Sequence, residues 1–221
     1  MTIKTVERDF HDAPRPVRVR FAPTVPDGGG AFLHCGHLAM LIMAAHVAQE
    51  NNCPLDFRFD GAPDIIGALD CMNAVAWLSI PIRRFYVLPV SNNRHVEMFA
   101  KGDKALAAGL TNWHLSSSYD DLYVENRTII VRGIEFKYKP IRDEITDAER
   151  VWGTQPFVEL LYPLMMRDGQ KMSKSLDNGV HWSVLKEFRP EKVTKVLLEF
   201  MENSNDYYEF RDVLKRLAND I

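Results

Sequence analysis

Two histidines and two lysines at short spacings are the residues of this sequence best suited to chemistry on phosphates. His34 and His37 flank Gly36 in the string HCGH, between a glycine-rich loop and an apolar stretch. Lys171 and Lys174 stand three apart in KMSKS, inside the polar stretch DGQKMSKSLDN. Imidazole and ammonium groups donate to phosphate oxygens and stabilise the negative charge that a phosphate gains in a transition state. The lysine pair is also suited to holding pyrophosphate as it leaves.

The histidine pair has two other interpretations, a metal site and a plain helix start. Metal-binding histidines on a helix usually stand four apart with a glutamate between them, and this pair meets neither condition. Cys35, Cys53 and Cys71 form no CxxC pair, which disfavours a structural zinc site and a disulfide framework. We therefore predict no metal site in the protein. Taken alone, HCGH would fit a helix N-terminus with surface histidines, and KMSKS would fit a solvated loop.

The elements around these motifs predict an α/β protein with a Rossmann-like parallel sheet, because strand and helix patterns alternate along most of the chain. The expected strands are 17–23, 54–60, 83–90 and 127–133, and the run 157–165 is apolar but of uncertain type. The expected helices are 37–51, 64–78, 93–109, 181–188, 190–203 and 207–220. We divide the chain into an N-terminal arm (1–16), a catalytic domain (17–180) and a short C-terminal helical tail (181–221).

The first strand, its loop and the following helix form a phosphate-binding arrangement. The loop TVPDGGGA (24–31) cannot hold regular structure. A helix that starts after it near Gly36 presents unpaired backbone N–H groups and the positive end of its dipole. Gly36 would let a nucleotide come close to the backbone.

Together and in this order, HCGH and KMSKS resemble the two signature motifs of the class I aminoacyl-tRNA synthetases, HIGH and KMSKS. The stretch RFAPTVPDGGGAFLHCGH resembles RFAPSPTGYLHIGH, which opens the catalytic domain of glutamyl- and glutaminyl-tRNA synthetases, with a few extra residues in the loop. RFDGAP at 58–63, WLSIPI from Trp77 and VRGIEF from Val131 resemble further segments of that domain. The likeness covers roughly residues 17–180. It implies a nucleotide-binding catalytic domain of the HUP type and an enzyme that forms an aminoacyl-adenylate from ATP.

The resemblance also implies roles for single residues. The expected catalytic residues are His34, His37, Lys171 and Lys174. The expected ATP-binding residues are the same four with Gly36 and Ser173. Arg20 would face the carboxylate of the amino acid, Asp60 its ammonium group, and Arg132 the side chain of a glutamate. Glutamate or glutamine is the expected amino acid, and Mg²⁺ would be carried by ATP more than by protein ligands.

The acceptor of the activated amino acid stays open. The segment 110–126 is short where the family inserts a domain for the tRNA acceptor end, and few residues follow KMSKS to build an anticodon-binding domain. tRNA is one possible acceptor, and a small molecule or carrier is another. A non-catalytic nucleotide-binding paralogue and a nucleotidylyltransferase that adenylates a cofactor precursor are further alternatives.

The composition predicts a soluble, cytoplasmic protein. The 221 residues are 46% hydrophobic and 26% charged, without an apolar run long enough to span a membrane. The net charge of −3 disfavours a basic module that binds nucleic acid unaided. We expect Cys35 to pack rather than react, and His46 to be a core histidine. Core positions are also expected for Met40, Met43, Met165, Met166, Phe85 and Tyr86.

Overall fold

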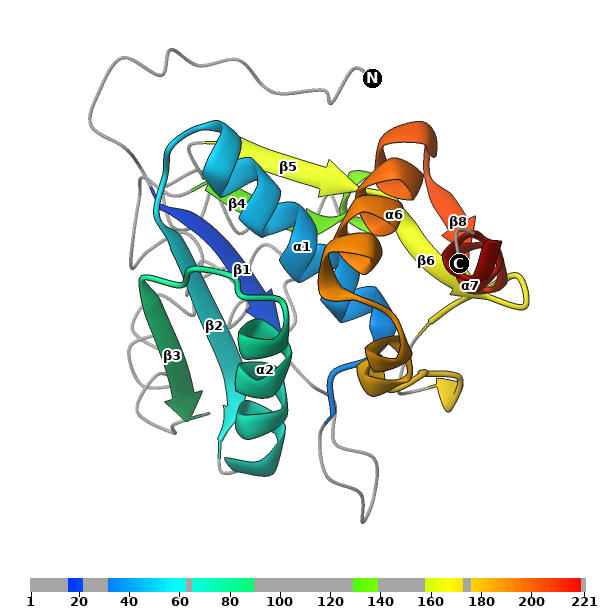
Figure 1. The fold of residues 1–221 in the computed structure, drawn as a ribbon. Coiled ribbons are helices and arrows are strands. Elements are labelled where there is room, and N and C mark those ends of the chain that lie inside the picture. The colour runs from blue at the N-terminus through cyan, green and yellow to red at the C-terminus, as the bar shows by residue number, and fades with distance from the viewer. Residues whose placement is uncertain are drawn as a thin grey trace, which may run out of the picture.

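A five-stranded parallel sheet forms the centre of the fold (Figure 1). The computed structural model describes residues 16–21, 32–62, 65–89, 129–138, 158–172 and 176–219. The strands of this sheet are β1 (Val17–Phe21), β2 (Leu55–Ala62), β3 (Arg84–Pro89), β4 (Ile129–Gly133) and β5 (Val158–Tyr162). Their order is β3-β2-β1-β4-β5, and every neighbouring pair is parallel. The predicted Rossmann-like α/β architecture is confirmed.

The order of the strands places a switch point between β1 and β4. The chain runs outward from β1 through β2 to β3, and β4 then returns to the other side of β1. In open parallel sheets, ligands bind in the crevice beyond the carboxyl ends of the strands at such a reversal. Residues that follow Phe21 and Gly133, the last residues of β1 and β4, are therefore the first place to look for a site.

Two helices complete the first half of the fold. The helix α1 (Cys35–Glu50) crosses the sheet, and α2 (Ile65–Trp77) lies on the same side of it (Figure 1). Most of α1 is apolar and buried, because one side packs on β1 and β4 and the other side on the C-terminal helix α6 (Pro190–Asn203). The helix α2 buries Ala68, Cys71 and Ala74.

The C-terminal part builds a second, three-stranded sheet in the order β7-β6-β8. Its strands are β6 (Leu164–Arg167), β7 (Gln170–Lys171) and β8 (Tyr207–Glu209). The other elements are α6, α7 (Phe210–Asn219) and two 3₁₀ helices, η1 (Ile134–Lys137) and η3 (Trp182–Glu187). Pro190 stands at the start of α6, where its missing N–H costs no hydrogen bond.

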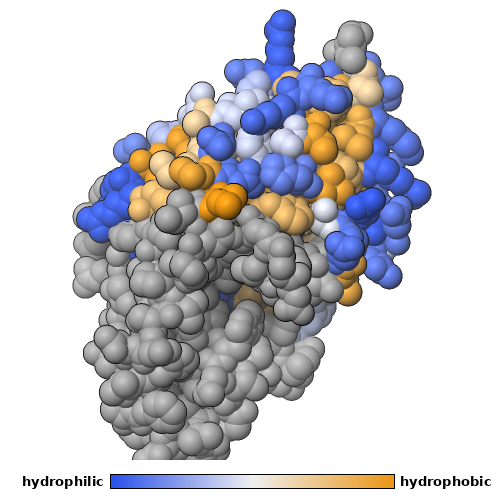
Figure 2. Space-filling model, turned by 90° about the horizontal axis from the view of Figure 1, so that it is seen from below, coloured by the Kyte–Doolittle hydropathy of each residue, from blue (hydrophilic) through white to orange (hydrophobic). Residues whose placement is uncertain are grey.

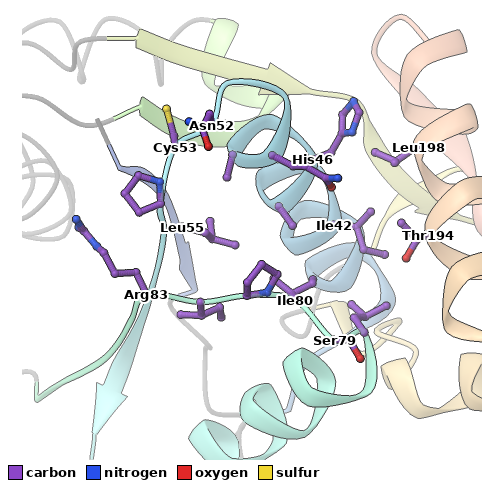
Figure 3. Close-up of a pocket in the computed structure, with 17 residues that line it drawn as sticks. Ile42, His46, Asn52, Cys53, Leu55, Ser79, Ile80, Arg83, Thr194 and Leu198 are labelled. Atoms are coloured by element: carbon purple, nitrogen blue, oxygen red, sulfur yellow. The ribbon is translucent and has the colours of Figure 1, made fainter. Parts of the chain in front are cut away.

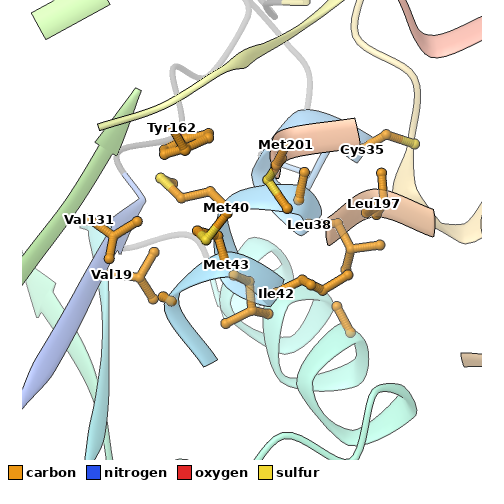
Figure 4. Packing of buried hydrophobic residues seen from close by; sticks show 14 of the residues in the cluster. Val19, Cys35, Leu38, Met40, Ile42, Met43, Val131, Tyr162, Leu197 and Met201 are labelled. Carbon is orange, nitrogen blue, oxygen red and sulfur yellow. The ribbon is translucent and has the colours of Figure 1, made fainter. Parts of the chain in front are cut away.

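One hydrophobic core joins the sheet, α1 and α6. Figure 4 shows Val19 and Val131 of the sheet, Met40 and Met43 of α1, and Leu197 and Met201 of α6 in this core. The expected burial of Met40, Met43 and Met165 is confirmed, whereas Met166 and Phe85 are only partly buried. Where the described residues lie on the surface seen from below, hydrophobic and hydrophilic residues are mixed (Figure 2). Among the described side chains of α2, the large exposed apolar ones are Ile66, Leu69 and Met72.

Several details differ from the sequence-based expectations. The uncertain run 157–165 contains β5 and the start of β6, and the tail is not purely helical because residues 207–209 form a strand beside β6. The segment 182–187 is a 3₁₀ helix. The expectation for His46 is wrong. Its side chain is 34% exposed, and its Nε2 lies 3.9 Å from a carboxylate oxygen of Glu202.

Some expectations concern residues outside the described ranges. These are the N-terminal arm up to residue 15, the loop 24–31, the expected helix 93–109, the segment 110–126, and Ser173 and Lys174 of KMSKS. In the part of the chain that the structure describes, no helix is long and apolar enough to cross a membrane.

Candidate active site

His34 is the N-cap of α1, with its ring folded back on the first turn. Its Nδ1 accepts a hydrogen bond from the backbone N–H of His37 at 3.3 Å. Because Nδ1 accepts, a neutral His34 ring carries its proton on Nε2. The ring is buried and stacks on the ring of His37 with 3.6 Å between the ring centroids. His34 thus starts a helix, but it is buried rather than a surface histidine, and its Nε2 is the nitrogen that can donate.

Gly36 and His37, in the first turn of α1, contact the cap and the end of β1. The His37 ring packs on Phe21, the last residue of β1, with 4.9 Å between the centroids. A Cβ added at Gly36 would stand 3.0 Å from Cε1 of His34. Glycine at this position therefore makes room for the folded His34 ring, which is a reason that the sequence analysis did not include.

Lys171 is the last residue of β7, which forms a β-hairpin with β6 through a two-residue turn. Asp168 and Gly169 connect β6 to β7 with φ of 54° and 75°, and positive φ at both positions is what a type I′ turn requires. The Lys171 side chain is half-exposed. Its backbone carbonyl accepts from the Asn178 side chain at 3.1 Å, so the two described flanks of the KMSKS segment are linked.

The histidine segment and the segment that follows KMSKS are joined through their backbones. Cys35 N–H donates to the carbonyl of Val180 at 2.8 Å, and Trp182 N–H donates to the carbonyl of Leu33 at 3.1 Å. His34 and His181 form an antiparallel bridge between these bonds. Residues 33–35 and 180–182, far apart in sequence, thus form a short ladder at the N-terminus of α1.

A second connection runs from α1 to the hairpin itself. A Cβ at Gly36 would lie 3.8 Å from the Cβ of Met165 in β6. The Met165 carbonyl in turn accepts from the backbone N–H of Met172, the residue after Lys171. The structure therefore brings His34, Gly36 and His37 to the same end of the molecule as Lys171.

The Lys171 ammonium group forms an ion pair with a carboxylate. Oε1 of Glu135, in η1 just after β4, lies 2.5 Å from Nζ of Lys171. The Glu135 carboxylate folds over Gly133, where an added Cβ would come within 1.9 Å of Oε2. The glycine of the string VRG thus allows this ion pair to form at the carboxyl end of β4.

The three positions expected to bind the amino acid lie near the carboxyl ends of parallel strands. Arg20 is the fourth residue of β1, Asp60 lies in β2 beside an irregularity in its pairing with β3, and Arg132 is the fourth residue of β4. Of these, only the Arg132 side chain is described. It is buried, with its guanidinium carbon 5.3 Å from the centroid of the Phe136 ring.

Asp70 of α2 is a site residue that the sequence did not reveal. Its carboxylate accepts from the backbone N–H of Leu33 and from the indole N–H of Trp182, both at 2.8 Å. An acid in the middle of an amphipathic helix gives no signal of such contacts.

Cys35, beside the histidines, is buried, and burial raises the pKa of its thiol to about 12. It is therefore a packing residue, as expected, and not a nucleophile.

A pocket of about 580 Å³ lies elsewhere (Figure 3). It is lined by the C-terminal half of α1, including Ile42 and His46, and by Leu55 at the start of β2 and Thr194 of α6. This is the opposite end of α1 from His37, away from the carboxyl ends of the strands. Among the described residues, no group of three or more His, Cys, Asp or Glu side chains could hold a metal ion.

Fold and candidate site define an α/β protein with a Rossmann-like sheet and a helix that starts at His34 beyond its first strand. No protein-family model matches the chain, and no curated protein sequence matches it. Its fold is similar to that of a Campylobacter jejuni protein provisionally described as an arginyl-tRNA synthetase, with 8% identity and a TM-score of 0.43. The similarity covers 92% of this chain and 67% of the other. At these values it carries no argument about function, which rests on the residues themselves.

Proposed function

We propose that this protein activates an amino acid with ATP, as class I aminoacyl-tRNA synthetases do. One observation carries the proposal. The short ladder between residues 33–35 and 180–182 ties the HCGH turn to the chain that leaves KMSKS. A helix N-terminus with two imidazoles and a lysine-bearing hairpin therefore share one end of the sheet, next to the switch point between β1 and β4.

In the proposed reaction, a carboxylate oxygen of the amino acid attacks the α-phosphorus of ATP in line. The bond from that phosphorus to the bridging oxygen breaks, and the electron pair leaves with pyrophosphate. The products are an aminoacyl-adenylate and pyrophosphate, with no covalent enzyme intermediate. In phosphoryl transfer the protein chiefly positions the reactants and neutralises charge.

The roles of the residues follow from their chemistry. The N–H groups at the start of α1, with His34 and His37, stabilise the charge on the α-phosphate. Lys171 and Lys174, with Ser173, hold the β- and γ-phosphates, and Gly36 leaves room for the His34 ring and for the nucleotide. Mg²⁺ arrives on the ATP phosphates and neutralises part of their charge, which requires no cage of protein ligands.

The amino acid that we propose is glutamate or glutamine. Arg20 would pair with its carboxylate in a two-pronged contact, Asp60 with its ammonium group, and Arg132 with its side chain. Transfer to tRNA is the proposed second step, and a non-tRNA acceptor is the alternative.

The test is amino-acid-dependent exchange between ATP and pyrophosphate, measured for all twenty amino acids with and without total tRNA. We expect one amino acid to respond. His37→Ala and Lys174→Ala should each lower the exchange rate by well over tenfold. The matched variants His46→Ala, at the far end of the same helix, and Lys195→Ala, on the exposed side of α6, should keep the parental rate. No exchange with any amino acid, together with intact ATP binding, would favour a non-catalytic nucleotide-binding protein instead.

A further inference from the structure

Asp70 contacts both halves of the candidate site. Besides the bonds from Leu33 and Trp182, its Oδ2 lies 3.2 Å from Nε2 of His181. Nδ1 of His181 accepts from the backbone N–H of Ser183 at 3.1 Å, so the proton of the neutral ring is on Nε2, the nitrogen that faces Asp70. One carboxylate thus accepts two hydrogen bonds and lies within ion-pair distance of the His181 ring.

The three residues that Asp70 contacts come from two segments that are far apart in the sequence. Leu33 directly precedes His34, the cap of α1, whereas His181 and Trp182 follow the KMSKS segment. These are the same segments that the backbone ladder joins. Asp70 therefore acts on the ladder from outside, through a third element, α2.

The surroundings make the contact well defined. The Asp70 side chain is 17% exposed, and Leu33 and Trp182 are almost completely buried. The Trp182 ring packs on Trp77 of the same helix α2, with 5.5 Å between the centroids. Hydrogen bonds to an ionised acceptor are stronger than neutral ones, and they strengthen further where water is excluded.

We infer that Asp70 is a positioning residue that holds the HCGH turn against residues 181–182, in the chain that follows KMSKS, and so fixes the side of the triphosphate site that these residues form. The inference rests on the proposed function of those motifs. Asp70 accepts hydrogen bonds from residues of the ladder, and in the proposed function it does not contact ATP or the amino acid. Its role is to fix the relative position of the groups that do touch the phosphates, and small displacements of such groups reduce rates strongly.

Asp70→Asn tests the inference, because it preserves size while turning one acceptor into a donor. That donor then faces the N–H of Leu33 or of Trp182. We expect hydrogen exchange of the Leu33 amide and the Trp182 indole to become at least tenfold faster, with protection in α6 unchanged. In pyrophosphate exchange, kcat should fall at least tenfold with the KM for the amino acid unchanged within about twofold. Trp182→Phe, which keeps the ring packing and removes one donor, should give a smaller effect of the same kind. Asp212→Asn, on the exposed side of α7, is the matched control and should change nothing.

The outcomes separate the inference from the proposed function. Parental kcat in Asp70→Asn, or a uniform loss of protection that includes α6, would overturn the positioning role. If the parental protein itself shows no exchange activity, the proposed function fails. The protection of Leu33 and Trp182 then still decides whether Asp70 couples the two segments.

Discussion

The ion pair between Glu135 and Lys171 gives a prediction with a definite sign. In the ligand-free protein the Lys171 ammonium lies against the Glu135 carboxylate. Phosphate oxygens must compete with that carboxylate, and its negative charge also repels them. Glu135→Gln should therefore raise the affinity for pyrophosphate and for ATP.

The size of the effect follows from the exposure of the two groups. At about 4 Å and an effective dielectric constant near 20, two unit charges interact by roughly 4 kcal/mol. The Lys171 side chain is 48% exposed and that of Glu135 is 23% exposed, so solvent screening brings the value toward the ~0.2–1 kcal/mol of exposed pairs. About 1 kcal/mol corresponds to roughly fivefold tighter binding, since ~1.4 kcal/mol is tenfold.

The assay is calorimetric titration of Mg²⁺–pyrophosphate and Mg²⁺–ATP at fixed ionic strength, because salt screens such interactions. Glu50→Gln, an exposed acid at the end of α1 away from the site, controls for the change in net charge. Gly133→Ala should act in the same direction as Glu135→Gln, because the added methyl group displaces the Glu135 carboxylate. Unchanged or weaker binding in Glu135→Gln would refute the reasoning, and weaker binding would mean that Glu135 presents Lys171 to the phosphates.

Three further predictions concern stability and reactivity. Arg83→Ala removes both hydrogen bonds that the Arg83 guanidinium donates to the fully buried Asp56, and should lower the free energy of unfolding by about 3–5 kcal/mol in urea titrations; a loss below about 1 kcal/mol would contradict it. The Cys35 thiol, whose pKa burial raises to about 12, should resist iodoacetamide at about pH 8 until the protein unfolds, and rapid native labelling in peptide mapping would contradict its burial. A hydrogen bond from Tyr138 lowers the pKa of Asp206, so the stabilisation from this carboxylate is present above its unfolded pKa of about 3.9 and is lost as the pH falls through the lower folded value. Asp206→Asn should therefore lose less stability than the parental protein between about pH 6 and pH 3. Equal losses would show that the hydrogen bond between Tyr138 and Asp206 contributes nothing to the pH dependence of stability.

The sequence was informative wherever a local pattern determines the structure. The alternation of apolar and basic residues in VRVRF predicts β1, and the apolar stretch after His37 predicts α1. Both predictions lie within two residues of the observed bounds. The motif residues His34, Gly36 and Lys171 were found because they stand in recognisable strings. The Asp-Gly pair at 168–169, between LMMR and QKM, is a local signal for the observed hairpin.

Contacts between distant segments could not be predicted in this way. Asp70 and Glu135 matter because of what the fold brings next to them, and neither stands in a pattern that indicates its partner. His46 lies in an apolar helix, but it lies beside a pocket and near Glu202 rather than in the core. The sequence predicts helix at β8, because YYE runs directly into the strongly amphipathic helix α7.

The central claim is that the HCGH turn and the KMSKS segment bind one triphosphate. Its most direct test is calorimetric titration of Mg²⁺–ATP into the parental protein, His37→Ala and Lys171→Ala, with His46→Ala and Lys195→Ala as controls. Each of the first two variants loses a hydrogen bond to charged phosphate worth about 1.5–3 kcal/mol, so ATP should bind roughly 10- to 100-fold more weakly, with both controls at parental affinity. Parental affinity in either His37→Ala or Lys171→Ala would contradict a shared site.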